Sequence, residues 1–71
     1  MTDPRFLAVL GGKIKDIRQK NNMTQNELAL QCNFEKASMS RIESGKTNVT
    51  VLTLRKISKA LNAEMFEFFQ D

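Results

Sequence analysis

The chain has 71 residues with 11 Lys or Arg, 8 Asp or Glu and no His, which gives a formal net charge of +3. A domain of this size buries only about 60% of the surface that its unfolded chain exposes, which leaves little room for a catalytic cleft. Without His and with a single Cys it also lacks the commonest general base, an internal disulfide and a zinc-ligand set. We therefore expect a cytoplasmic protein that is not an enzyme and that binds no metal or cofactor. We also expect that it does not span a membrane, because its longest apolar run covers only residues 6–10.

The first helix is predicted to begin at Asp3-Pro4, because Asp caps helices well and Pro suits the first helical position. Its apolar residues recur at spacings of three and four and so form one stripe, made of Leu7, Leu10, Ile14 and Ile17. Gly11 and Gly12 weaken a helix by about 1 kcal/mol each, so we expect a close neighbour there. The helix is expected to end at residues 21–22.

The second helix is predicted to start after Thr24, which forms a capping box with Glu27. It is expected to stop at Asn33, since Asn tolerates the left-handed conformation. A short third helix then covers residues 36–44 and ends at Gly45. Two short helices joined by such a tight turn cannot lie antiparallel, so we expect them to cross steeply.

The fourth helix is predicted between a Thr50 cap and a stop at Asn62, and a fifth, short helix covers about residues 64–70. No stretch alternates in the manner of a strand. The sequence thus predicts an all-α fold of five helices in a single domain spanning residues 1–71.

The third helix carries an unusual polar arc. Met39 and Ile42 point one way, and four side chains fall together on the opposite side, namely Lys36, Ala37, Ser40 and Arg41. Lys and Arg donate to guanine edges, Ala meets the thymine methyl, and Ser bonds either partner. An ordinary solvated helix face is also polar, so the arc alone leaves both interpretations open.

Three motifs then indicate a family. T-Q-N-E-L-A at residues 24–29 is followed by S-R-I-E-S-G at 40–45 and L-x-x-I-x-x-A-L at 54–61. Together they resemble the Cro/C1-type helix-turn-helix family of phage repressors, over about residues 10–69. The resemblance implies a compact lambda-repressor-like DNA-binding domain with its helix-turn-helix at about 24–44. It also implies that the recognition helix, residues 36–44, enters the major groove of double-stranded DNA.

The resemblance also assigns roles to individual positions. It implies that the arc residues Lys36, Ala37, Ser40 and Arg41 read bases. It implies that the phosphate contacts are Gln25, Ser38, Lys46, Thr47 and Asn48. Arg18 and Glu43 match a partly buried ion pair that ties the first helix to the end of the recognition helix.

Some positions depart from the family pattern. Asn33 replaces the usual turn Gly, Val49 replaces a frequent Pro, and Glu35 stands where the recognition helix is usually capped by Ser or Thr. Glu is a poor cap, so a shift of the helix start by about two residues is expected here. Cys32 falls at a buried aliphatic position, where a core role outweighs redox sensing.

The end of the chain differs in charge from the rest. Residues 1–61 sum to +6 and residues 62–71 to −3. Met65, Phe66 and Phe69 are more apolar than the fold needs, so we expect the last helix, about 64–70, to form a dimer interface. A lone exposed aromatic side chain on a monomer is the alternative.

These observations favour a transcription regulator, of the repressor or controller-protein kind, that binds a palindromic operator as a homodimer. Operators of this kind match two-fold protein symmetry. The alternative is an antitoxin or another protein-binding module that clasps a protein partner with its Phe-rich tail.

Overall fold

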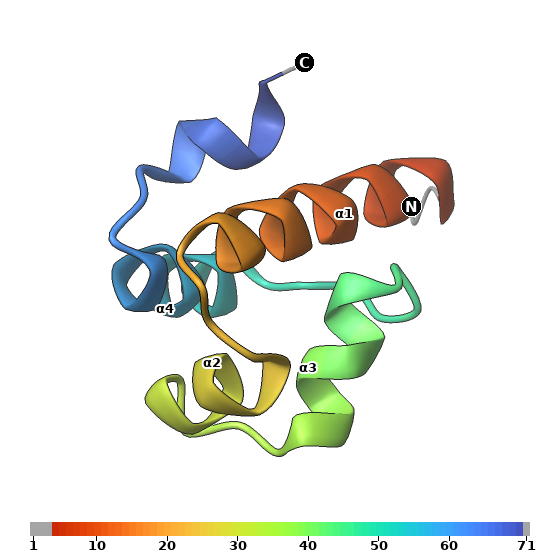
Figure 1. Ribbon diagram of the computed structural model, residues 1–71. Helices are drawn as coiled ribbons and strands as arrows, with labels where there is room; N and C mark the ends of the chain where they lie inside the picture. Colours follow the sequence, from red (N-terminus) through yellow and green to blue (C-terminus); the bar gives the residue numbers. More distant parts are fainter. Residues whose placement is uncertain (1–3, 71) are drawn as a thin grey trace.

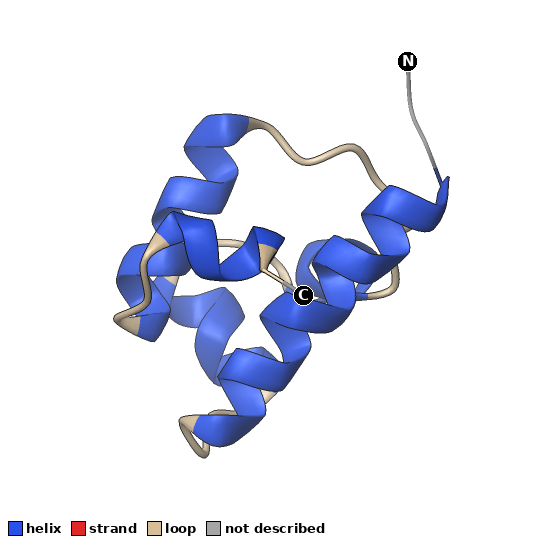
Figure 2. Ribbon diagram, turned by 90° about the horizontal axis from the view of Figure 1, so that it is seen from above, coloured by secondary structure: helices blue, strands red, loops and turns tan. Residues whose placement is uncertain are grey.

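The computed structural model describes residues 4–70, and within that range every regular element is helical (Figure 2). Four α-helices precede one 3-10 helix: α1 (Pro4–Lys20), α2 (Gln25–Gln31), α3 (Lys36–Glu43), α4 (Val51–Leu61) and η1 (Met65–Phe69). The all-α prediction is confirmed. The prediction of five α-helices is wrong, because the last element is a 3-10 helix.

The length of η1 explains its conformation. Five residues are too few to recover the cost of nucleating an α-helix, whereas 3-10 segments are commonly this short. Side chains three residues apart eclipse each other in a 3-10 helix. Met65 and Phe68 therefore share the side that packs on the core, whereas Phe66 and Phe69 share the exposed side.

The helix ends follow the local signals in the sequence. Asn22, Asn33 and Asn62 all adopt positive φ angles, of 55°, 59° and 54°, where α1, α2 and α4 stop. Thr24 and Glu27 form the expected capping box, with bonds of 2.7 and 3.0 Å. The expected stops are thus confirmed. Asp3, the expected cap of the first helix, lies outside the described residues.

One residue from each element meets at the centre of the core. Less than 2% of the surface of these five side chains is exposed: Ile14, Leu28, Met39, Ile57 and Phe68. Figure 1 shows α1 running across the molecule, with η1 on one side of it and α2 and α3 on the other. The α2 and α3 axes cross steeply, as the tight turn between them requires (Figure 1).

Gly11 lets α1 approach the end of α3. A Cβ atom on Gly11 would lie 2.5 Å from the carbonyl oxygen of Glu43 and closer still to that of Ile42. A Cβ atom on Gly12 would meet nothing within 4 Å. The expected close neighbour exists at Gly11 only, and it sets the position of α3 against α1.

Candidate nucleic-acid interface

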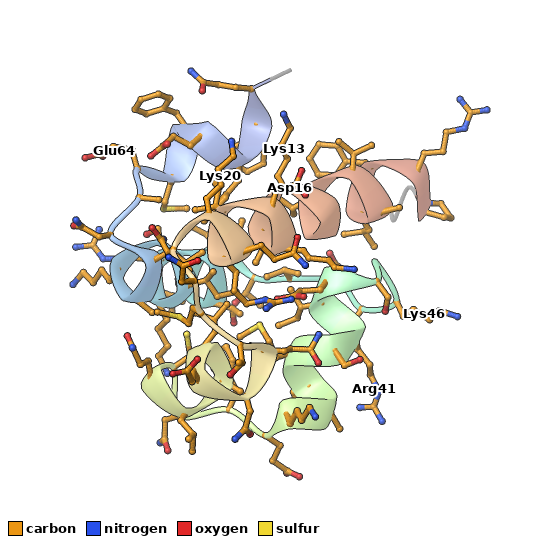
Figure 3. All side chains as sticks on the ribbon, viewed as in Figure 1. Lys13, Asp16, Lys20, Arg41, Lys46 and Glu64 are labelled. Atoms are coloured by element: carbon orange, nitrogen blue, oxygen red, sulfur yellow. The ribbon has the colours of Figure 1, made fainter. Side chains whose placement is uncertain are left out.

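The outer side of α3 gathers the four residues expected to read bases. All four are exposed, namely Lys36, Ala37, Ser40 and Arg41, whereas Met39 and Ile42 on the inner side are buried. Arg41 forms no salt bridge within residues 4–70 and extends away from the body (Figure 3). The helix begins at Lys36, and Glu35 precedes it without a side-chain capping bond.

The segment after α3 is held close to that helix. Gly45 has a φ of 74° and packs against the backbone of Ala8, and the Lys46 N–H donates to the Arg41 carbonyl at 2.9 Å. Lys46 projects on the same side of the molecule as Arg41 (Figure 3). A cationic edge therefore continues from α3 into the following loop.

Several predicted contact residues line one hollow of about 270 Å³ between α3 and the start of α4. These residues are Ser38, Arg41, Thr47 and Asn48. The structure thus brings residues from α3 and from the loop after it to one concave surface. The exposed Arg41 gives this hollow a positive charge, which suits an anionic ligand.

A buried ion pair fixes α3 on α1. The Arg18 guanidinium donates to both Glu43 carboxylate oxygens, from Nε at 2.7 Å and from Nη2 at 3.0 Å, and its Nη1 donates to the Met23 carbonyl at 2.8 Å. Only 9% and 3% of the two side chains are exposed. Arg18 is therefore a structural residue and has little surface left for DNA.

Gln25 lies apart from the residues 46–48. Its amide nitrogen donates to Glu43 Oε1 at 3.1 Å, and its side chain lines a second, smaller hollow with Ser40 and Ser44. The predicted phosphate contacts therefore fall into two groups on either side of α3.

The residues expected to form the dimer interface separate into two sides of η1. Met65 is half-buried on the core, whereas Phe66 and Phe69 are 59% and 51% exposed. Phe69 stacks on Phe6 of α1, with ring centroids 6.2 Å apart, next to the exposed Val9. Phe6 and Val9 are not among the residues that the sequence predicted for the dimer interface. Their position outside the apolar stripe of the first helix was the signal that could have found them.

Other site chemistry is sparse in residues 4–70. No group of three His, Cys, Asp or Glu side chains there could hold a metal, and none of the helices has the length and apolarity of a membrane span. Cys32 is buried in the core. Burial raises the pKa of its thiol, and Lys56 opposes that shift.

Residues 14–68 match the model of a helix-turn-helix family. The control protein C.BamHI of Bacillus amyloliquefaciens is 40% identical over 57 residues, which cover 79% of this chain and 70% of that protein. The antitoxin HipB of Escherichia coli K12 is 36% identical over 56 residues, covering 79% and 64%. The crystal structure of the restriction-modification controller protein C.AhdI from Aeromonas hydrophila superposes with a TM-score of 0.86 at 25% identity, covering 89% and 96% of the two chains.

Proposed function

This chain belongs to the Cro/C1-type helix-turn-helix family of DNA-binding transcription regulators, and we propose that it binds a palindromic operator as a homodimer through residues 36–44. The observation that carries the proposal is the outer side of α3. Its polar and cationic side chains are exposed together, and the Arg18–Glu43 pair and Gly11 hold the helix rigidly from behind. Such a helix suits the width of the major groove.

In this proposal Lys36, Ala37, Ser40 and Arg41 contact base edges. Arg41 is the strongest candidate, because guanidinium groups bond both acceptors of guanine. Residues on the two flanks of α3 contact the backbone phosphates: Gln25, Ser38, Lys46, Thr47 and Asn48. The relatives are named as regulators or as an antitoxin, which agrees with a chain that is not an enzyme and that works in the cytoplasm, where DNA is accessible.

The first experiment selects bound duplexes from a random pool, which returns the operator, its symmetry and its half-site spacing. Arg41→Ala is then titrated against the selected and a scrambled site. We expect a loss of about 1–3 kcal/mol on the selected site only, with relaxed preference at one base pair. Arg55→Ala removes the same charge from an exposed position on α4 and is the control. Equal losses on both duplexes would exclude Arg41 from base recognition.

The apolar surface across α1 and η1 supports the homodimer. Each of its four side chains is more than half exposed: Phe6, Val9, Phe66 and Phe69. Half-exposed Phe side chains offer roughly 100 Å² each. The four side chains together therefore supply apolar surface equal to about half of the ~800 Å² that each partner buries in a standard interface. Roughly this fraction of such an interface is apolar.

A second candidate function has support from the relatives named antitoxin HipB. As an antitoxin, this chain would use the same apolar surface to hold a different protein. Sedimentation of the pure chain separates the two functions. We expect a dimer at micromolar concentration that becomes a monomer in Phe66→Glu. A wild-type monomer, together with a heteromeric complex when the protein is purified from its own cell, would favour the antitoxin.

A further inference from the structure

Lys15 lies on the side of α1 that packs against the end of α3. Gly11, Lys15 and Arg18 are spaced by four and three residues, so they share one face of the helix. Gly11 touches the carbonyl groups at the end of α3, and Arg18 binds Glu43. The exposed Lys15 side chain therefore emerges between two fixed contacts of α1 with α3.

A hollow of about 200 Å³ lies at this junction of three helices. Its lining consists of Lys15 from α1, Gln25 from α2, and Ser40, Glu43 and Ser44 at the end of α3. Ser40 also belongs to the exposed arc of α3 that is proposed to enter the major groove. The hollow therefore opens beside the surface that would face DNA.

The charges of the hollow favour an anion. The Arg18 guanidinium, at 2.7 and 3.0 Å, neutralises the Glu43 carboxylate at its base. Lys15 forms no salt bridge within residues 4–70, so it adds one uncompensated positive charge. The Gln25 amide nitrogen has two protons and gives one to Glu43, which leaves a second proton to donate. A singly charged phosphodiester matches this set.

We propose that Lys15 and Gln25 together bind one phosphate of the DNA backbone in this hollow, and that Glu43 orients the Gln25 amide for this contact. The proposal rests on the proposed function, because it needs a duplex against α3. It adds a residue of α1 to the interface. The recognition helix would then be flanked by phosphate contacts on both sides, with residues 46–48 on the other.

The test compares Lys15→Gln with Lys20→Gln by measuring affinity for the selected operator as salt is raised. Both changes remove one charge from an exposed position of α1, but Lys20 points away from α3 (Figure 3). Each phosphate contact contributes about 0.9 to the slope of log affinity against log salt. Lys15→Gln should therefore make this slope shallower by about 0.9. When salt is raised fourfold, the operator affinity of Lys15→Gln should then fall by a factor about 3.5 times smaller than the affinity of wild type does. Lys20→Gln should keep the wild-type slope.

A Lys15→Arg variant should also keep the wild-type slope, since it retains the charge. A slope unchanged in Lys15→Gln, or lowered equally in Lys20→Gln, would overturn the proposal while leaving DNA binding intact. Wild type without salt-sensitive binding to any duplex would refute the proposed function itself.

Discussion

Two adjacent glycines in α1 give a matched test of how α1 positions α3. Replacing either one by Ala removes the same backbone freedom and should gain up to about 1 kcal/mol of helix propensity. At Gly12 nothing lies within 4 Å of the added Cβ, so Gly12→Ala should keep this gain. We expect a stabilisation of about 0.5–1 kcal/mol.

At Gly11 the added methyl meets backbone that cannot rotate away. The Glu43 carbonyl oxygen would lie 2.5 Å from the new Cβ, with the Ile42 oxygen closer, so α3 has to move. Overpacking of this kind costs about 1–3 kcal/mol. Because two backbone carbonyl groups block the new methyl, we take the upper value of about 3 kcal/mol, and after subtracting a propensity gain of about 1 kcal/mol we expect Gly11→Ala to lose about 2 kcal/mol.

Thermal unfolding followed by circular dichroism measures both variants. One kcal/mol shifts the Tm of a domain this small by about 4–8 °C. Gly11→Ala should therefore melt at least about 8 °C below wild type and Gly12→Ala a few degrees above it. Operator affinity should fall in Gly11→Ala even below its Tm, because α3 is displaced. Shifts of the same sign in the two variants would refute the argument.

Three further predictions concern the interior and the caps. Arg18→Ala leaves the Glu43 carboxylate buried without its partner and should cost about 3–5 kcal/mol in urea denaturation; a loss below about 1 kcal/mol would contradict the buried pair. Hydrogen bonds from the Thr24 backbone N–H and, to a smaller extent, with the Thr24 hydroxyl lower the pKa of the Glu27 carboxyl. The charged Glu27 therefore stabilises the fold fully above the ordinary carboxyl pKa of about 4.3, and this stabilisation is lost as the pH falls through the lower pKa of the folded state. An acid titration by circular dichroism should show a weaker pH dependence in Glu27→Gln, and an unchanged curve would count against this cap. Burial should keep Cys32 unreactive toward a thiol reagent until the protein unfolds, which an absorbance assay in and out of urea checks; rapid native labelling would argue against a closed core.

The features that the sequence predicted well depend on nearby residues. Asn33 and Asn62 mark helix ends because Asn tolerates a positive φ whatever surrounds it. Thr24 and Glu27 cap α2 across only three residues. The polar arc of α3 follows from the helical repeat. In each case the interacting groups lie within about two turns of chain, so spacing alone identifies them.

The errors concern contacts between distant residues. The stack of Phe6 on Phe69 joins the two ends of the chain, and no local pattern pairs them. The same holds for Lys15, which reaches the Gln25 hollow only because α1 crosses the end of α3. The prediction of a fifth α-helix is a separate, local error, because five residues are too few to recover the cost of nucleating an α-helix.

By itself, the amino-acid order determined an all-α domain, the stops of its helices and the polar side of residues 36–43, since each depends on steric preference and spacing along the backbone. Only the tertiary structure decided which glycine is packed, that Phe6 stacks on Phe69 and which cation stands beside Gln25. These depend on how close two helices come, and that distance is set by the packing of all five elements around Ile14, Leu28, Met39, Ile57 and Phe68.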